Sequence, residues 1–323
     1  MWRPTASLDA IRARATLYKT VRQFFFQRDV LEVETPLLCT STAMDPYLES
    51  YSISDSSLKK ERFLQTSPEF PMKRLLAAGS GSIYQIGKAF RRGEESPRHN
   101  PEFTMLEWYQ PNFHLPDLQR EVLDLVAELA QVFGVAGWGI DSVECLSYAD
   151  LFESVVGLDP HVSSLEQLEN VAKQHVNIDG DALTRDAWLD LLMSHVVEPK
   201  MPQGLLVLTD FPVGQAALAE IASDNKGRKV AKRFELYVAG LELANGYQEL
   251  VDATEQRQRF EGDALQRQQN GVAQLPMPSH LIEALEAGMP PASGVAIGLD
   301  RLLMLLLGKQ SLSEVLCFPW DRA

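Results

Sequence analysis

The sequence predicts an α+β fold in which an antiparallel β-sheet is flanked by helices. Its helical and strand-like segments do not alternate regularly, as they would in a βαβ fold. Apolar residues make up 45% of the 323 residues, which is enough to bury a large core. No internal repeat or low-complexity linker divides the chain. We therefore expect a single domain that spans residues 1–323.

The first part of the chain is predicted to hold a helix followed by extended segments. Ser7 can cap a helix whose apolar residues recur at helical spacing up to about Asp29. The extended segments cover residues 30–38, 83–91 and 100–109. Polar residues 92–99 form a loop between the last two of these segments. A helix with one apolar stripe follows over residues 118–133.

The middle of the chain carries no chemical motif. We expect residues 136–233 to decorate the core as an insertion, with a helix at 188–197 and a buried strand at 205–208. The elements expected after the insertion are a strand over 234–243, a turn at Asn245 and Gly246, and helices over 255–269 and 299–307.

The chain is acidic, with 44 acidic and 30 basic residues and a net charge of −14. Nucleic-acid binding draws much of its affinity from Lys and Arg, so this balance disfavours a generic tRNA-binding protein. The densest basic stretch runs from Lys226 to Arg233. Such a run is usually a solvated face or a mobile loop, and we expect either this stretch or the loop with Arg92 and Arg98 to form a local docking patch for a protein partner.

Two observations predict a cytoplasmic location. No run approaches the roughly 20 apolar residues of a membrane span, and the first residues lack the basic-then-apolar order of a signal peptide. The cysteines are widely spaced and odd in number, so we expect unpaired thiols of a reducing compartment. They are Cys39, Cys145 and Cys317.

A first group of candidate residues lies on the segments around residues 90–109. Arg91, Arg92 and Arg98 concentrate positive charge at the loop. In the strand that follows, alternate residues share one face. These residues are Phe103, Met105, Glu107 and Tyr109. A ring and a carboxylate on one face suit a nucleotide base and an ammonium ligand, although an ordinary amphipathic sheet face shows the same alternation.

A second group follows from the expected turn at Asn245 and Gly246. Such a turn would place Glu242 directly opposite Glu249 on neighbouring strands. Two facing carboxylates repel unless a cation lies between them, and carboxylate oxygens suit Mg²⁺. A solvent-exposed hairpin with screened charges is the alternative.

A third group lies where a glycine-punctuated strand enters an apolar helix. Gly298 permits close approach of a ligand, and Arg301 near the helix start is placed for phosphates or a base. Tight packing around Gly294 and Gly298 explains the pattern equally well.

Together and in this order, the three groups resemble the signature motifs of class II aminoacyl-tRNA synthetases. The matching segments are Glu34–Thr35–Pro36, Phe90–Arg91 with residues 98–103, and residues 298–301. Residues 66–69, 72–75 and 242–249 are most similar to lysyl-tRNA synthetase. The resemblance covers nearly the whole chain. It implies a class II catalytic fold that forms a homodimer through the first motif.

Departures from lysyl-tRNA synthetase change the expected acceptor. Few residues precede the first helix, so we expect no anticodon-binding domain, and tRNA is not an expected partner. Ser67 stands where the synthetase usually has Ala, and Ala296 stands where it usually has Gly. These features are similar to the elongation factor P (R)-β-lysine ligases, a family of synthetase paralogues. That family joins (R)-β-lysine to the ε-amino group of a lysine on elongation factor P.

The resemblance implies ATP and Mg²⁺ as cofactors and an acyl-adenylate as intermediate. The implied catalytic residues are Arg91, Glu242, Glu249 and Arg301. Those implied to bind ATP are Arg91, Arg92, Gly93, Asn100, Phe103, Glu242, Leu243, Gly298 and Arg301. Those implied to bind the amino acid are Ser67, Pro68, Glu69, Tyr109, Glu249 and Ala296. The implied metal ligands are Glu242 and Glu249.

Within these roles, Arg91 would hold the α-phosphate, and Phe103 and Arg301 would sandwich the adenine. The second motif of the synthetase has a glutamate where this chain has Gly93, and Glu94 follows it. Two alternatives to the ligase remain. One is a truncated lysyl-tRNA synthetase that charges tRNA with α-lysine, and the other is an inactive paralogue with a regulatory role.

Overall fold

The computed structural model describes residues 2–54, 61–176 and 183–323. The chain folds into two compact units. The first unit comprises Met1–His114, Glu128–Val135 and Leu250–Ala323, and the second comprises Leu115–Ala127 and Ala136–Glu249. Helix α3 (Leu115–Phe133) contributes residues to both units.

The first helix confirms the prediction from the sequence. Helix α1 (Leu8–Phe26) begins where the Ser7 hydroxyl accepts a hydrogen bond of 3.1 Å from the Ala10 amide. That bond satisfies one of the amides that a helix start leaves without a partner. Leu17, Val21 and Phe25 form its buried side.

The first unit contains a mostly antiparallel sheet with the order β1-β5-β6-β12. Strand β1 pairs with β5 in parallel, and β6 pairs antiparallel with both β5 and β12. The bounds are Leu31–Glu32 for β1, Ile83–Phe90 for β5, Glu102–Pro111 for β6 and Ala292–Gly298 for β12. A small sheet of β2 (Leu38–Cys39), β4 (Arg62–Leu64) and β3 (Ser52–Ile53) accompanies it. The predicted strands before and after the loop at 92–99 are therefore confirmed.

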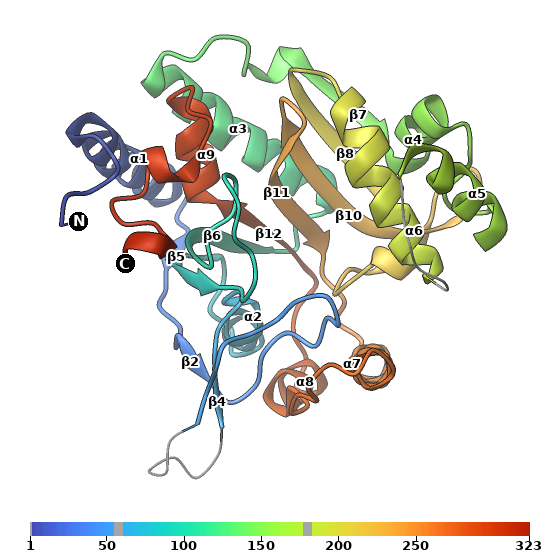
Figure 1. Cartoon of the computed structure of the whole chain (residues 1–323). Helices are drawn as coiled ribbons and strands as arrows, with labels where there is room; N and C mark the ends of the chain where they lie inside the picture. Colours follow the sequence, from blue (N-terminus) through green and yellow to red (C-terminus); the bar gives the residue numbers. More distant parts are fainter. Residues whose placement is uncertain (1, 55–60, 177–182) are drawn as a thin grey trace. The chain divides into compact units, whose positions relative to one another are not determined.

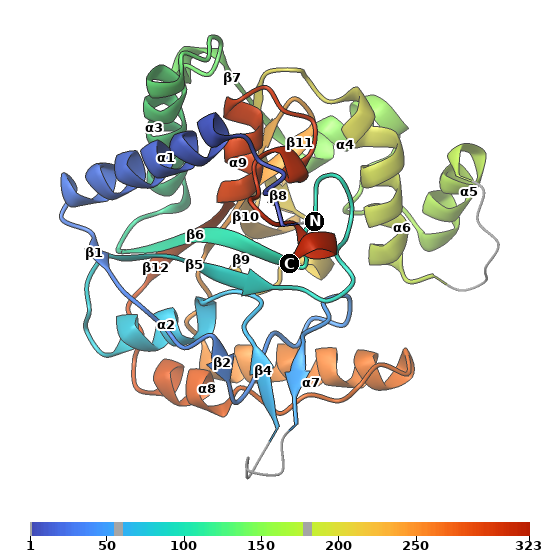
Figure 2. The same ribbon diagram turned by 60° about the vertical axis from the view of Figure 1, so that its left-hand side comes forward.

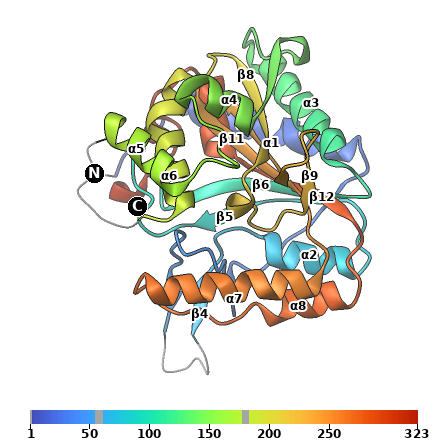
Figure 3. The same cartoon turned by 90° about the vertical axis from the view of Figure 1, so that its right-hand side faces the viewer.

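Helices lie on both sides of this sheet (Figure 2). On one side, the Phe25 ring of α1 packs against Tyr84 and Trp108, with ring centroids 4.3 and 5.3 Å apart. Helix α9 (Leu299–Leu306) lies on the same side. On the other side, α2 (Glu69–Ala77) lies above α7 (Ala253–Gln269) and α8 (Ser279–Glu286) (Figure 3).

A buried carboxylate ties three of these elements together. Asp300 of α9 accepts a hydrogen bond of 2.6 Å from the Thr104 amide of β6. Its other oxygen lies 2.5 Å from the guanidinium of Arg14 in α1, and the Asp300 side chain is 3% exposed. Asp300 therefore fixes the start of α9, which carries Arg301, against the sheet.

The second unit contains strands in the order β11-β10-β8-β7, with β9 on β10. The bounds are Val143–Ser147 for β7, Leu205–Phe211 for β8, Ile221–Ser223 for β9, Lys229–Val238 for β10 and Leu241–Gln248 for β11. Helices α4 (Tyr148–Val156), α5 (Leu165–His175) and α6 (Arg185–Leu192) gather beside β7 and β8 (Figure 1). Phe152, Leu168 and Trp188 of these helices are fully buried in their common core. The predicted helix at 188–197 is α6, continued by one π-helical turn at Met193–Val197.

The predicted turn at Asn245 and Gly246 is wrong. Both residues lie inside β11, where Asn245 pairs with Glu235 and Gly246 with Phe234. The chain reverses instead at Ala239 and Gly240, which have φ values of 51° and 72°. An Asn-Gly pair is a strong local turn signal, but burial of the long strand β10 against both neighbours outweighs it.

Glu242 and Glu249 are consequently not opposite each other. Glu242 pairs with Tyr237, whereas Glu249 forms a bridge with Ala219. The register shifts by one residue after Glu242, because Ala244 rather than Leu243 pairs with Leu236. Such a bulge reverses the alternation of side chains, so Glu242 shares a face with the odd-numbered residues that follow it.

Candidate active site

The first unit has a sheet face made of small and polar residues. In the β5-β6-β12 register, Glu107 lies between Gln85 and Ala296, and Met105 lies between Gly87 and Gly298. Residues that pair across antiparallel strands point to the same face. This face, which we call the floor, lies opposite the face that packs against α1. Gly298 and Ala296 carry little or no side chain, which leaves space for a ligand above that part of the strands.

Glu107 is the most unusual residue of the floor. Its carboxylate is 2% exposed and accepts hydrogen bonds from the Ser67 hydroxyl at 2.8 Å and the Tyr109 hydroxyl at 2.6 Å. Burial and, to a smaller extent, the nearby Glu69 carboxylate raise the pKa of Glu107 to about 7, against the opposing effect of the two hydrogen bonds. A buried carboxylate held by two hydroxyls is suited to bind an ammonium group.

The start of α2 supplies the second carboxylate. The Ser67 hydroxyl accepts a hydrogen bond of 3.0 Å from the Glu69 amide, which places both residues at one helix end. Glu69 lies 2.7 Å from the ammonium of Lys73, whose side chain is 1% exposed. Lys73 therefore balances one negative charge beside the floor. The structure brings together the predicted residues Ser67, Glu69, Tyr109 and Ala296.

Arg91 lies at the other end of the floor. Its guanidinium carbon is 5.2 Å from the centre of the Phe103 ring. A guanidinium nitrogen of Arg91 also lies 3.7 Å from a carboxylate oxygen of Glu94. Glu94 is thus next to the motif arginine, where it can replace the carboxylate missing at Gly93. The predicted Phe103–Arg301 sandwich stays a prediction, since Arg91 is the arginine placed over that ring.

The loop after Arg91 has its own contacts. Gly93 has φ of 83°, a conformation that favours glycine, and Arg92 lies 3.6 Å from Glu49. Arg301 and His99 place side-chain nitrogens 2.8 Å apart. The Asn100 amide donates to the Glu102 carbonyl at 2.6 Å and accepts from the Trp320 amide at 2.9 Å. Asn100 thus anchors residues near the C-terminus to the loop, and its ATP contact stays a prediction.

In the second unit, Glu242 lies beside a buried ionic cluster. Arg233 of β10 is paired with Glu235, and its guanidinium lies 4.5 Å from the Phe211 ring. The Tyr237 hydroxyl donates to Glu235 at 2.5 Å. Burial raises the pKa of Glu235, Arg233 lowers it, and the charge of Glu242 raises it again. The Arg233 cation therefore offsets two carboxylates on one strand pair.

This cluster removes Arg233 from the docking patch predicted for residues 226–233, because the side chain is paired and mostly covered. The Arg233 side chain is only 17% exposed, and that of Arg228 only 13%. Arg228 pairs with Asp159 at 2.8 Å and Asp224 at 2.7 Å. Buried, paired arginines cannot dock a partner, which leaves Lys226 and Lys229 as the exposed charges of the stretch.

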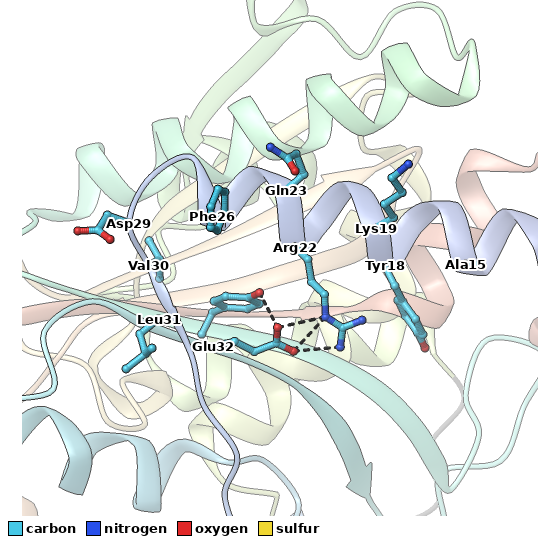
Figure 4. Close-up of a pocket in the computed structure, with 11 residues that line it drawn as sticks. Ala15, Tyr18, Lys19, Arg22, Gln23, Phe26, Asp29, Val30, Leu31 and Glu32 are labelled. Atoms are coloured by element: carbon cyan, nitrogen blue, oxygen red, sulfur yellow. Dashed lines mark hydrogen bonds and ion pairs between the residues drawn. The ribbon is translucent and has the colours of Figure 1, made fainter.

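A separate hollow of about 930 Å³ lies between α1 and β1 (Figure 4). At its base, Glu32 accepts hydrogen bonds from Arg22 at 2.9 Å and from the Tyr84 hydroxyl at 2.9 Å. The Arg22 hydrogen bond lowers the pKa of Glu32. Apolar side chains of Phe26 and Leu31 lie beside it, 79% and 56% exposed.

Possible metal ligands do not gather in a large cluster. Within the described parts of the chain, no group of three or more His, Cys, Asp and Glu residues could hold a metal ion. The cysteines form no disulfide, as predicted. In residues 2–54, 61–176 and 183–323, no helix is long and apolar enough to cross a membrane.

The sequence placed Glu107 on a candidate face suited to an ammonium ligand, but the family resemblance gave it no role, and Gln85 was not named at all. A carboxylate within the otherwise apolar run from Met105 to Tyr109 was the available signal for Glu107. Gln85 gave no comparable signal.

Comparison with known proteins agrees with this geometry. A family model described as tRNA synthetases class II (D, K and N) matches residues 1–322. The chain belongs to the class II tRNA synthetase family. The floor and Arg91 are accordingly placed on the fold of a class II synthetase, as the sequence predicted.

Individual relatives share the full length of this class II chain. A protein of Pseudoalteromonas translucida is 44% identical over 100% of this chain and 99% of its own. Proteins of Haemophilus influenzae and Pasteurella multocida are 43% and 44% identical over 100% of this chain and 98% of theirs. All three are named elongation factor P--(R)-beta-lysine ligase.

Proposed function

We propose that this class II enzyme activates (R)-β-lysine with ATP and transfers it to the ε-amino group of a lysine on elongation factor P. The observation that carries the proposal is the buried Glu107 carboxylate, held by Ser67 and Tyr109 on the floor. Relatives at 43–44% identity named for this ligation support it.

The first step joins the amino acid to AMP. A carboxylate oxygen of the amino acid attacks the α-phosphorus, and the bond from that phosphorus to the bridging oxygen breaks, so that pyrophosphate leaves. Charge accumulates on the α-phosphate oxygens in the transition state. Arg91 is the cation proposed to stabilise it, with Glu94 orienting the guanidinium. The Phe103 ring offers a face on which the adenine can stack.

The floor sets the direction of the substrate. Arg91 and Phe103 mark one end, and Glu107 lies four residues further along β6 than Phe103, about 13 Å away. A six-carbon diamino acid with its carboxylate near Arg91 would extend its terminal ammonium towards Glu107. Ionised Glu107 neutralises that ammonium, while Ser67 and Tyr109 hold the carboxylate in place.

Mg²⁺ would reduce the charge of the ATP phosphates. Glu242 supplies the oxygen ligand that Mg²⁺ prefers, and we propose it as a protein ligand. Glu249 follows directly after β11, where it forms a bridge with Ala219. We propose that Glu249 binds Mg²⁺ together with Glu242 or binds the substrate ammonium. These two roles are carried over from the family motif.

The second step forms the amide. The neutral lysine amine of elongation factor P attacks the acyl carbon of the adenylate, loses a proton, and AMP leaves with the bonding electrons. The exposed loop residues Arg92 and Arg98 are the proposed docking cations for that partner. Reversing the charge of Arg98, which has no implied role in ATP binding, should slow transfer to the protein and leave adenylate formation unchanged.

Transfer of labelled amino acid tests the proposal directly. Radiolabelled (R)-β-lysine and α-lysine are each incubated with the enzyme, ATP and Mg²⁺, in parallel with elongation factor P and with tRNA. We expect label on the protein, faster with (R)-β-lysine, and none with the Arg91→Ala variant. Label on tRNA instead would identify a tRNA-charging enzyme, and no label on either acceptor would favour an inactive paralogue.

We also propose that two copies of the chain associate through α1 and β1, the elements around the first motif. The support is the exposed apolar side chains of Phe26 and Leu31 beside the hollow of Figure 4. Such side chains are costly to leave in water when they lie together.

A further inference from the structure

Gln85 lies on the floor beside Glu107, and the proposed reaction gives it no role. The two residues pair directly across β5 and β6, so their side chains point to the same face. Gln85 is 3% exposed. Within the described part of the chain, its side-chain oxygen is buried and accepts no hydrogen bond. Native proteins seldom leave such an acceptor unsatisfied, so each case needs an explanation.

Gly87 explains how the Gln85 amide fits on the floor. The amide nitrogen of Gln85 lies 2.9 Å from the position that a Cβ atom at residue 87 would occupy. Any side chain at residue 87 would therefore push the amide away. Gly87 and Gln85 together build a neutral acceptor into the floor, beside the pair of strands that carries Glu107.

An ammonium group is a ligand that this arrangement fits. It has three N–H donors, and the Glu107 oxygens already accept one hydroxyl hydrogen each. A second carboxylate at residue 85 would repel Glu107, whereas an amide oxygen adds an acceptor without further charge.

We infer that the Gln85 side-chain oxygen accepts a hydrogen bond from the terminal ammonium of the amino-acid substrate, beside Glu107. This inference rests on the proposed function, because it assumes a diamino acid on the floor. It makes Gln85 a specificity residue that favours substrates with a terminal amine over those without one.

The test pairs an enzyme variant with a substrate variant. Adenylate formation is measured by ATP–pyrophosphate exchange for wild type and Gln85→Leu, with (R)-3,6-diaminohexanoic acid and with (R)-3-aminohexanoic acid, which lacks the terminal amine. Gln85→Leu should lower kcat/KM for the diamino acid roughly ten- to hundred-fold, as expected for one hydrogen bond to a charged group. For the analogue the change should stay within about twofold.

Two further variants separate recognition from a structural role. Gly87→Ala displaces the Gln85 amide without removing it, and should reproduce the selective loss for the diamino acid. Gln110→Leu removes another buried glutamine, 4% exposed, from the opposite face of β6. It should lower stability and leave the ratio between the two substrates unchanged. If Gln85→Leu fails to fold, Gly87→Ala still gives the answer.

Equal losses on both substrates with Gln85→Leu and Gly87→Ala would overturn the inference and leave the proposed function intact. Wild-type enzyme that cannot adenylate the diamino acid would overturn the proposed function, and the inference with it.

Discussion

At the scale of single residues, we expect Glu107 to determine how the activity of the enzyme depends on pH. Burial raises its pKa to about 7, so the carboxylate is largely protonated at pH 6 and largely ionised at pH 8. Only the ionised form attracts an ammonium ligand. We therefore expect kcat/KM for (R)-β-lysine to rise with pH through an apparent pKa near 7. Glu107→Gln should abolish this inflection in pyrophosphate exchange, and an unchanged profile would contradict the assignment.

The same residue is expected to lower stability at high pH. The folded protein keeps the Glu107 proton above pH 4.5, the ordinary value, whereas the unfolded chain releases it. The unfolding free energy therefore falls between about pH 4.5 and 7, and the full cost remains above pH 7. Glu107→Gln should stabilise the fold by about 1–3 kcal/mol at pH 8 and by little at pH 4.5. Urea denaturation at both pH values measures the difference.

The sequence indicated which residues line the candidate site, but it did not indicate which side chains contact one another there. Arg91, Ser67, Glu69 and Tyr109 were assigned from motifs, and the structure places them around one sheet face. Glu107 was seen to share the face of Tyr109, yet strand periodicity cannot tell a binding face from a packing face. That distinction depends on which face α1 covers, and therefore on contacts far apart in sequence.

At the scale of elements, the reversal between β10 and β11 requires glycine at residue 240. Gly240 has φ of 72°, and a Cβ atom there would lie 3.1 Å from the Glu198 carbonyl oxygen. Gly240→Ala should therefore cost about 1–2 kcal/mol of unfolding free energy. Gly262 in α7 has open space around it, so Gly262→Ala should instead stabilise by about 0.5–1 kcal/mol. Thermal denaturation compares the pair, and equal effects would argue against the turn.

Asp300 has a structural role within a motif that was assigned to ATP binding. It connects α9 to Thr104 of β6 and to Arg14 of α1. Asp300→Asn keeps the shape of the side chain but leaves the buried Arg14 cation without its counter-charge. This substitution should lower the unfolding free energy by about 3–5 kcal/mol. Arg14→Met with Asp300→Asn should recover much of that loss in urea denaturation. A double variant as unstable as the single one would exclude charge as the cause.

Local signals predicted most elements but failed where the sheet dominates. The Ser7 cap and the apolar spacing of α1 are contained within one segment, so the helix was predicted well. The Asn245–Gly246 turn was predicted by equally local evidence and is wrong. Pairing of β10 with both β8 and β11 places the chain reversal at Ala239. That pairing joins segments far apart in the sequence, so it cannot be predicted from a short stretch of residues.

At the scale of the whole molecule, the α1 surface should determine the oligomeric state. Phe26→Asp places a charge at the exposed apolar end of α1, and we expect it to convert a dimer to a monomer. Leu265→Asp on α7 is the matched control, since Leu265 is 56% exposed and lies outside α1 and β1. Light scattering after size exclusion gives the mass. A wild-type monomer, or dimers of both variants, would refute the proposed interface.

The two ends of the described chain are fastened to each other. The Thr5 amide donates to the Cys317 carbonyl at 2.9 Å, and the Thr5 hydroxyl donates to the Leu316 carbonyl at 2.8 Å. Ends held this close can be joined by a short linker at little entropic cost, and new ends can be opened in an exposed loop. Circular permutation is therefore available, and a permuted chain opened near Gly271 would bring fused reporter proteins to α7 rather than to the loop at residues 92–99, which Asn100 connects to Trp320.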